Sequence, residues 1–250
     1  MGYGRSRPGF VQVISGHYLN AVAESQGIAT WRRSDHIGGR LRRLYIKLRK
    51  LPIILRMRLI LASSSPRRRQ LLRNAGFDFD VQASNIKEKI HPGEPAEEFA
   101  RRAAREKAVQ VAASSPHGSL VLGADTVVVI DGETLGKPAD LDDAARMLRL
   151  LSGRTHQVHT GICIVQAPDK IAALKHETTL VTFRELDEEE IRDYLKSGEP
   201  MDKAGAYAVQ GLASKFVTRI SGCYTNVVGL PVALVYETLK PLLKTEGSWE

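Results

Sequence analysis

From Arg58 onward the chain alternates short β-branched or aliphatic runs with helical stretches, and this alternation restricts the fold more than any other feature. The run 120–130 has the length and the Val and Ile content of a central strand, and Asp131-Gly132 turns it into a second short strand. Residues 96–113 are rich in Ala, Glu, Arg and Lys, which is typical of a long helix. The alternation predicts an α/β fold, in which a mixed sheet carries helices on its faces and a cleft forms where the polar loops gather.

The remaining pattern places the other elements. We expect a helix at 66–74, with Ser65 as its N-cap and Pro66 at its first position, and a helix that Asp187 opens with Glu190 in a capping box. Further strands are predicted at 59–62, 79–83, 155–165, 176–183, 207–209 and 216–221, and further helices at 141–151 and 231–243. No internal repeat interrupts this order, and residues 57–250 are predicted to form one domain.

The positive charge of the chain is concentrated at its N-terminus. The net charge is +8, yet residues 1–56 hold eleven Lys or Arg against Glu24 and Asp35, and the remaining residues hold 25 basic and 26 acidic side chains. This nearly neutral body gives no support for nucleic-acid binding outside residues 1–56. We interpret the basic N-terminal extension, residues 1–56, either as an arm that contacts an anionic partner or as residues upstream of a true start at Met57. We favour the second interpretation because Met57 leads directly into a strand.

The cysteines and the apolar segments limit the class of protein further. Cys163 and Cys223 lie far apart without CxxC or His-rich spacing, which argues against a disulfide framework or a zinc site and favours the reducing cytoplasm. The best membrane candidate, 51–61, is interrupted by a proline and two arginines and falls short of the roughly 18 apolar residues that a membrane helix needs. We therefore expect a cytoplasmic protein that has no membrane partner.

A serine-rich turn with three arginines is the first candidate for binding phosphate. The run Leu59-Ile-Leu-Ala-Ser-Ser-Ser-Pro-Arg-Arg-Arg ends a strand and begins a helix, and the free N–H groups at a helix start favour an anion. Hydroxyl and guanidinium groups, among them Ser63, Arg67 and Arg68, add donors and positive charge at the same point. An ordinary capped helix with a solvated basic face fits this spacing equally well, and the run lacks the GxxxxGK[ST] pattern of a Walker loop.

Asp125 is the strongest candidate for a catalytic group. It stands with Thr126 in Gly123-Ala-Asp-Thr-Val-Val-Val, at the start of a β-branched run that should form the centre of the sheet. A buried strand seldom holds a carboxylate unless that group is paired or functional. We expect Asp125 to bind a divalent ion or to take a proton from an attacking water molecule. The alternative is an aspartate that is hydrogen-bonded to a turn at the edge of the strand.

Three further polar residues stand beside glycine or proline in loops. Lys137 in Gly-Lys-Pro and Lys203 in Asp-Lys-Ala-Gly-Ala-Tyr are suited to neutralise a polyphosphate. Gln210 in Val-Gln-Gly offers both a donor and an acceptor, the combination that reads the edge of a base. Exposed residues in plain turns are the alternative interpretation for all three.

Taken together and in this order, several strings of the chain resemble the Maf family of nucleotide pyrophosphatases. Each string is modest by itself, whereas the ordered set is highly specific and covers nearly all of residues 57–243. The strings are Leu61-Ala-Ser-Ser-Ser-Pro-Arg-Arg, Lys107-Ala, Gly123-Ala-Asp-Thr-Val-Val, Leu135-Gly-Lys-Pro, His156-Gln-Val-His-Thr-Gly, Asp202-Lys-Ala-Gly-Ala-Tyr and Gly229-Leu-Pro.

The resemblance implies a fold, a reaction and a set of binding residues. The fold is an elongated mixed-sheet α/β fold of the Maf and ITPase type, with two lobes around a central cleft, often found as a homodimer. By analogy Asp125 activates a water molecule that attacks the α-phosphate of a nucleoside triphosphate, and pyrophosphate leaves. The residues that fall where the family lines its phosphate pocket are Ser63, Arg68, Lys107, Lys137 and Lys203. A triphosphate carries up to about four negative charges, which such cations would oppose.

Three positions bear on the choice of base. The branch of the family that acts on dTTP and UTP has Arg after Ser-Pro, Thr after the catalytic Asp and Gln before a later Gly, and Arg67, Thr126 and Gln210 match all three. The branch that acts on 7-methyl-GTP has Trp, Gln and Glu at these positions. The resemblance therefore favours dTTP and UTP, with 7-methyl-GTP as the alternative substrate. A non-catalytic nucleotide-binding regulator of cell division is the alternative from a different class.

The chain departs from the family pattern at the predicted metal site. The family often has Asp-Ile-Asp-Glu after the second strand, whereas this chain reads Asn-Ile-Lys-Glu and ends at Glu88. The final acid is retained, so the resemblance implies a divalent metal ion, usually magnesium, held by Glu88 and Asp125. Asn85 and Lys87 reduce the negative charge of the segment.

Overall fold

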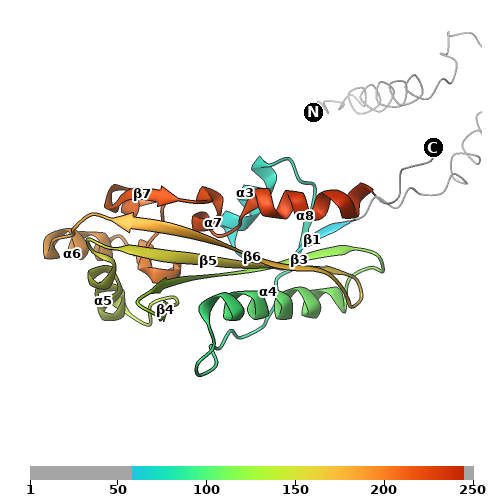
Figure 1. Ribbon diagram of the computed structural model, residues 1–250, viewed down its shortest axis with the longest axis horizontal. Coiled ribbons are helices and arrows are strands. Elements are labelled where there is room, and N and C mark those ends of the chain that lie inside the picture. Colours follow the sequence, from blue (N-terminus) through green and yellow to red (C-terminus); the bar gives the residue numbers. More distant parts are fainter. Residues whose placement is uncertain (1–57, 245–250) are drawn as a thin grey trace, which may run out of the picture. The chain divides into compact units, whose positions relative to one another are not determined.

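The computed structural model describes residues 58–244, and the predicted N-terminal extension, residues 1–56, lies outside them (Figure 1). One sheet contains the strands β1 (Leu59–Leu61), β2 (Asp80–Val81), β3 (Leu120–Ile130), β4 (Glu133–Leu135), β5 (Thr155–Gln166), β6 (Lys170–Phe183) and β7 (Val217–Ser221). The α-helices are α3 (Pro66–Asn74), α4 (Ala96–Ala112), α5 (Leu141–Leu151), α6 (Glu188–Lys196), α7 (Tyr224–Val228) and α8 (Val232–Lys244). The 3₁₀ helices η1 (Glu199–Asp202), η2 (Ala204–Ala206) and η3 (Leu212–Phe216) connect α6 to β7.

The sheet is mixed and runs in the order β2-β1-β3-β5-β6-β7, with β4 paired to the end of β3. β1 is parallel to β2 and β3, whereas β3, β5, β6 and β7 form an antiparallel series. On one edge of β3, residues 120–122 pair with β1 and residues 128–130 pair with β4. Along 123–127 no strand of the described residues pairs with that edge. We call this gap between β1 and β4 the notch.

Successive residues of β3 point to opposite faces of the sheet, and helices cover both faces. Leu122 and Ala124 pack in a cluster with residues of α3 and α8, whereas Val121 packs in a cluster with residues of α4. Figure 1 shows α4 along one face of the sheet and α3, α7 and α8 along the other. The alternation directs Asp125 to the α4 face and Thr126 to the α3 face. A single strand thus delivers side chains to both sides of the notch.

Two glycines allow α4 to lie directly on the sheet. A Cβ atom at Gly123 of β3 would lie 2.2 Å from the carbonyl oxygen of Ala104, and one at Gly161 of β5 would lie 2.2 Å from that of Ala100. Only a hydrogen atom fits at these positions, so glycine is required for close approach. The contact fixes the height of α4 above β3 and brings Lys107, less than one turn beyond Ala104, to the notch.

The hydrophobic core is divided between the two ends of the long strands. At one end, Leu61, Leu72 and Leu239 belong to the cluster beneath α3 and α8. At the other end, Leu148 and Phe216 belong to a cluster that α5, α6 and the 3₁₀ helices cover. These clusters form two lobes with the notch between them. The predicted α/β fold, an elongated mixed sheet flanked by helices with two lobes around a cleft, is confirmed.

Most predicted elements agree with the structure within a few residues, and the N-cap at Ser65 and the capping box at Asp187 are both present. The predicted strand 207–209 is wrong. Residues 204–206 form a 3₁₀ helix in which Gly205 and Ala206 have φ values of 68° and 60°, and the segment that follows pairs with no strand among the described residues. The strand predicted at 176–183 is longer in the structure, because β6 begins at Lys170 and pairs with β5 along its whole length.

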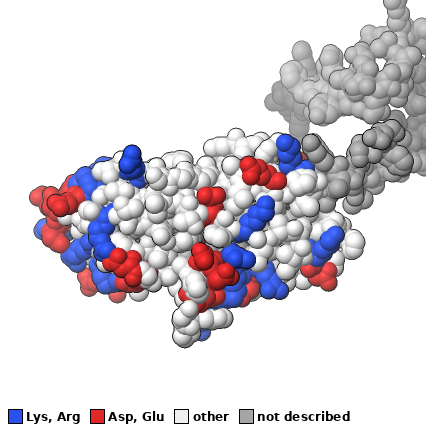
Figure 2. Space-filling model, viewed as in Figure 1, with Lys and Arg blue, Asp and Glu red and all other residues white. Residues whose placement is uncertain are grey.

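The surface of the described residues gives two further limits. No helix within 58–244 combines the length and the apolar content that crossing a membrane requires. On the face in view in Figure 2, acidic and basic side chains alternate over the described part and form no continuous basic stripe. This mixture matches the near balance of charges in the sequence after residue 56.

Candidate active site

A cavity of about 600 Å³ lies at the notch between the two lobes. Its volume falls within the range of small-molecule sites. The structure brings every predicted site residue to this one cavity, although they come from six separate stretches of the chain. The predicted residues that line it are Ser63, Arg67, Arg68, Glu88, Lys107, Asp125, Thr126, Lys137, Lys203 and Gln210.

Asp125 lies buried on β3, with 4% of its surface exposed, and faces α4. Its Oδ1 accepts a hydrogen bond of 2.6 Å from the Nζ of Lys107, which is also buried. Its Oδ2 is buried without a hydrogen-bond partner among the described residues. Burial raises the pKa of Asp125, and the positive charge of Lys107 offsets part of that increase. The carboxylate is therefore paired on one oxygen and unpartnered on the other.

Arg68 is held on the opposite side of the notch by three hydrogen bonds. Its Nε donates to the carbonyl oxygen of Gly229 at 2.7 Å, its Nη1 to Ser63 Oγ at 3.3 Å and its Nη2 to Thr126 Oγ1 at 3.0 Å. Burial lowers the pKa of Arg68, partly offset by Asp125, but a guanidinium remains charged in proteins. A guanidinium has five N–H groups, and three of them make these hydrogen bonds. One N–H on each of the two terminal nitrogens therefore remains for a ligand.

The serine-rich turn before α3 has the geometry of an anion site. Ser65 caps the helix, with its Oγ accepting from the backbone N–H of Arg68, and Pro66 occupies the first helical position. Ser63 Oγ accepts from the backbone N–H of Ser65 at 3.2 Å. The predicted capped helix is thus present, and its N-terminus lines the cavity together with Arg67. The positive end of the helix dipole favours a negative group there.

The other wall of the cavity is built from turns. Lys137 lies exposed in the segment after β4, and Gln210 lies exposed after η2. Lys203 donates from its Nζ to the carbonyl oxygen of Glu199 at 3.1 Å and pairs with the carboxylate of Asp202. The second oxygen of Asp202 lies 3.5 Å from Arg67 Nη1, an ion pair that joins the two walls.

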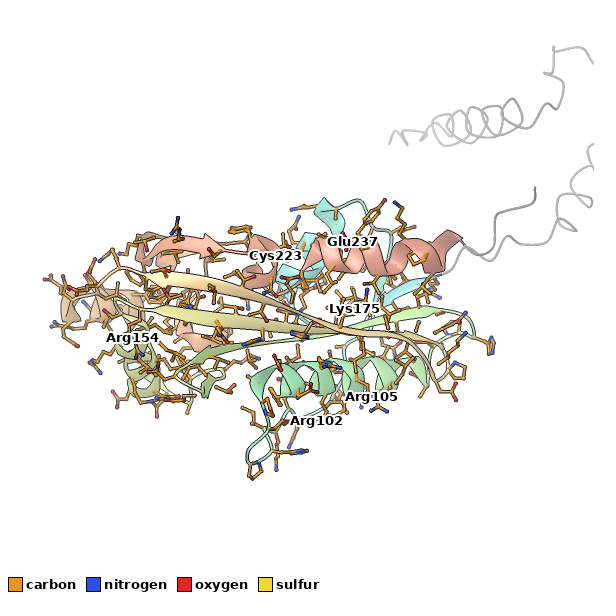
Figure 3. All side chains as sticks on the ribbon, viewed as in Figure 1. Arg102, Arg105, Arg154, Lys175, Cys223 and Glu237 are labelled. Carbon is orange, nitrogen blue, oxygen red and sulfur yellow. The ribbon has the colours of Figure 1, made fainter. Side chains whose placement is uncertain are left out.

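Glu88 reaches the site from the loop between β2 and α4. Its carboxylate pairs with Lys107, so one ammonium group lies between Glu88 and Asp125. Arg102 anchors this loop, donating to both carboxylate oxygens of Glu94 and, at 2.7 Å, to the carbonyl oxygen of Lys89. Figure 3 shows Arg102 on the side of α4 that faces away from the sheet.

The charges around the cavity suit a polyanion together with a cation. Five basic and three acidic side chains line it, an excess of two positive charges: Arg67, Arg68, Lys107, Lys137, Lys203, Glu88, Asp125 and Asp202. Within 58–244 no group of three or more His, Cys, Asp or Glu side chains forms a complete metal cage. Magnesium commonly uses one or two carboxylates and takes its other ligands from phosphate and water. Glu88, Asp125 and the unpartnered Oδ2 fit that pattern.

Two residues that contact the predicted site residues have no role predicted from the sequence. Asp202 lies between Arg67 and Lys203, and Thr160 of β5 places its Oγ1 2.9 Å from that of Thr126. Both lie inside strings that carry the family resemblance. These strings were the signal in the sequence that could have identified Asp202 and Thr160, because an aspartate in a turn and a threonine in a strand are not unusual by themselves.

Comparisons with known proteins identify the family of this chain. A family model for Maf-like proteins matches residues 58–242. The chain is 52% identical over 184 residues to a dTTP/UTP pyrophosphatase of Koribacter versatilis, covering 74% of this chain and 94% of that protein. It is 50% identical over 182 residues to a dTTP/UTP pyrophosphatase of Pelotomaculum thermopropionicum, covering 73% and 95%. A solved nucleoside-triphosphatase/dITP/XTP pyrophosphatase from Mycobacterium abscessus has 14% identity over 52% of this chain and 76% of that chain, and its TM-score of 0.34 is too low to bear on the fold. This chain belongs to the Maf-like protein family.

Proposed function

We propose that this protein is a nucleoside triphosphate pyrophosphatase that hydrolyses dTTP and UTP to the monophosphate and pyrophosphate. The observation that carries the proposal is the buried Asp125, paired with Lys107 through one oxygen, in a cavity with an excess of positive charge. Such a site suits a reaction in which water attacks one phosphate of a polyanion. The names of the relatives that are about half identical over the same region support the choice of substrate.

The reaction follows from the surroundings of Asp125. Its Oδ2 accepts a proton from a water molecule in the cavity, and the oxygen of that water forms a bond to the α-phosphorus. The bond between the α-phosphorus and the bridging oxygen breaks, and pyrophosphate leaves with the electron pair. Burial raises the pKa of Asp125 and makes it a stronger base than an exposed aspartate, while the positive charge of Lys107 favours its ionised form.

The cations stabilise the charge of the departing pyrophosphate. Arg68 offers one N–H on each of its terminal nitrogens, the fork that matches phosphate oxygens. Lys137 and Lys203 approach from the opposite wall. Electrostatic groups fixed before the reaction need no rearrangement when the charge develops, which lowers the barrier.

Glu88 and Asp125 would hold the divalent cation that the family resemblance implies, usually magnesium. The carboxylates of Glu88 and Asp125 converge on one ammonium group, and this shared position is the observation that favours a cation at this point. When bound, the ion supplies Lewis-acid polarisation of a phosphate oxygen.

Selection of the base is assigned to the wall that carries Gln210. An amide side chain donates through its nitrogen and accepts through its oxygen. Thymine and uracil present an N–H donor beside a carbonyl acceptor, so one amide matches both groups.

The family resemblance further supports a homodimer in the cytoplasm, and the free thiols of Cys163 and Cys223 are compatible with a reducing compartment.

Pyrophosphate release by the purified protein, measured with magnesium over the common nucleoside triphosphates and 7-methyl-GTP, tests this function. We expect turnover of dTTP and UTP and little turnover of purine nucleotides. Each nucleotide that reacts should give one monophosphate and one pyrophosphate, since one anhydride bond breaks. Equal activity on ATP and GTP would contradict the choice of base, and release of inorganic phosphate instead of pyrophosphate would contradict the reaction.

A further inference from the structure

The loop between β2 and α4 brings Glu88 to the notch in an alternating pattern. Every second residue of its first part lines the cavity, and the residues between them do not. Alternation is typical of extended chain, in which successive side chains point to opposite sides. The segment pairs with no strand among the described residues, so contacts outside the sheet have to hold it. The residues that line the cavity are Ser84, Ile86, Glu88 and Ile90.

Glu88 is held only weakly by its own side chain. That side chain is 40% exposed, and among the described residues its carboxylate is held by the ion pair with Lys107. The same ammonium group pairs with Asp125. Because Lys107 divides its charge between two carboxylates, the position of Glu88 depends on how the backbone beside it is held.

Arg102 of α4 holds the loop on the C-terminal side of Glu88. Its Nε and Nη2 donate to the two carboxylate oxygens of Glu94 at 2.7 and 2.8 Å, and Nη2 also donates to the carbonyl oxygen of Lys89 at 2.7 Å. A bidentate pair of this kind fixes geometry as well as charge. The hydrogen bonds from Arg102 lower the pKa of Glu94 to about 2, so the pair stays ionised at neutral pH.

Gln110 of α4 holds the loop on the N-terminal side of Glu88. Its Oε1 accepts a hydrogen bond of 2.9 Å from the backbone N–H of Asn85. Arg102, Glu106 and Gln110 are spaced four residues apart and therefore share one face of α4, and Figure 3 shows that Arg102 points away from the sheet. The loop is thus tied to this face three residues before Glu88 and one residue after it.

We propose that Arg102 and Gln110 are positioning residues that clamp the loop to α4 and hold Glu88 at the notch for a divalent cation. The proposal rests on the proposed function, which assigns the cation to Glu88 and Asp125. Arg102 and Gln110 are not among the described residues that line the cavity, so both act through the backbone beside Glu88. The clamp therefore sets how tightly the site holds the cation, whereas proton transfer to Asp125 is left intact once the cation is bound.

Limited proteolysis with trypsin reports the position of the loop without any nucleotide. Lys87 and Lys89 are exposed and lie between the two anchors, and an anchored segment is cut only when it opens locally. We expect Arg102→Leu to raise the rate of cleavage after these lysines by about tenfold, since it removes hydrogen bonds to a charged group. Gln110→Leu should act in the same direction by a smaller factor, and Gln110→Glu, which keeps the acceptor, should behave as the wild type. Arg105→Leu, at an exposed position of the same helix, is the control.

The magnesium dependence of pyrophosphate release tests the link from the clamp to the cation. In Arg102→Leu the magnesium concentration that gives half the maximal rate should rise about tenfold, while kcat at saturating magnesium stays within about twofold of the wild type. The double variant Arg102→Leu/Glu94→Gln should match Arg102→Leu alone, because the two residues act through one contact. A purely structural role of Arg102 would lower the melting temperature without changing the magnesium requirement.

The outcomes separate this inference from the proposed function. If the wild-type protein releases no pyrophosphate from any nucleotide, the proposed function fails, while the trypsin series still decides whether the clamp holds the loop. Equal cleavage of Arg102→Leu and Arg105→Leu would overturn the inference. A fall in kcat of Arg102→Leu with an unchanged magnesium requirement would overturn it as well.

Discussion

The two walls of the cavity are built in different ways. On the wall formed by α3, α4 and β3, the side chains of Ser63, Arg68, Lys107 and Asp125 line the cavity and are buried. On the wall formed by the turns after β4 and η2, Lys137 and Gln210 are exposed and Lys203 is partly buried. We call the first the buried wall and the second the turn wall.

The difference follows from what each wall has to hold. A buried charge is costly unless it is paired and hydrogen-bonded, and the buried wall satisfies this condition through Lys107 with Asp125 and Arg68 with Gly229. Groups fixed in this way are suited to the reacting phosphates, where small displacements are costly. The turn wall is open to solvent and carries the groups assigned to the base and the far phosphates. The comparison predicts chemistry on one wall and selection on the other.

The largest expected effect comes from removing the negative charge of Asp125, at the centre of the buried wall. Asp125→Asn keeps the shape of the side chain but removes the proton acceptor. We expect kcat for dTTP to fall by about a thousandfold, within the range of a lost general base. Pyrophosphate release under saturating nucleotide measures this change.

The control for Asp125→Asn is Asp142→Asn, on the exposed side of α5, which should leave kcat unchanged. Near-normal turnover in Asp125→Asn would remove the distinction between the walls, because the carboxylate would then not take the proton. Comparable melting temperatures of the two variants keep the result independent of folding.

The second-largest effect is expected on stability, from a substitution that disrupts the packing of α4 against the sheet. In Gly161→Ala the new Cβ would lie 2.2 Å from the carbonyl oxygen of Ala100, a backbone atom that yields only if α4 moves. We expect a loss of more than about 3 kcal/mol in the free energy of unfolding, since overpacking against backbone exceeds the usual cost. Urea unfolding measures it.

Gly136→Ala is the matched control on the turn wall, because its added Cβ meets no atom within 4 Å. Its free energy of unfolding should stay within about 0.5 kcal/mol of the wild type, as for most surface substitutions. Equal losses in both glycine variants would mean that the turn wall is packed as tightly as the buried wall.

The same comparison explains how much the sequence predicts. The elements of the buried wall carry strong local signals: a β-branched strand, an alanine-rich helix and a Ser-Pro cap, and all three are present as expected. The three consecutive arginines illustrate the limit. Successive residues of a helix point in different directions, and tertiary packing alone decides that Arg68 turns inward beneath Gly229.

The turn wall is where prediction from sequence failed. The strand expected at 207–209 is absent because this segment pairs with no strand among the described residues: Tyr207 is extended, but it follows a turn in which Gly205 and Ala206 have positive φ values. Ala206 gives no sign of this conformation in its residue type. The pairing of Lys107 with Asp125 also depends on α4 lying close to the sheet, a tertiary contact that motif spacing does not encode.

A smaller effect, on substrate binding, is expected from substituting Glu199, which is hydrogen-bonded to the turn wall. Glu199 accepts hydrogen bonds from Tyr194 Oη at 2.8 Å and from the backbone N–H of Leu212 at 3.1 Å, and Gly211 lies against its carboxylate. Glu199→Gln loses one acceptor and should loosen the turn that presents Gln210. We expect KM for dTTP to rise about fivefold, with kcat unchanged within about twofold, from the weakening of one hydrogen bond.

Steady-state kinetics with dTTP and dCTP check this split, and Glu189→Gln, on the exposed part of α6, is the control. The ratio of dTTP to dCTP turnover should fall in Glu199→Gln alone. A fall in kcat with unchanged KM would place Glu199 with the buried wall and contradict the division of roles.

The smallest effect concerns the histidine that supports the turn wall. His156 is buried, its Nε2 lies 2.9 Å from the hydroxyl of Tyr207, and burial lowers its pKa to about 4 from 6.5. The folded protein therefore keeps the ring neutral while the unfolded chain takes up a proton, so stability falls as the pH drops from about 6.5 toward 4. Between pH 6 and 5 this group should contribute a loss of about 1 kcal/mol in the free energy of unfolding.

Urea unfolding at a series of pH values measures how the free energy of unfolding changes with pH. In His156→Gln this slope should be shallower by that amount, whereas His117→Gln, at an exposed position, should keep the wild-type slope. Identical slopes in all three proteins would mean that His156 is solvated in the folded state and that the turn wall lacks a rigid support.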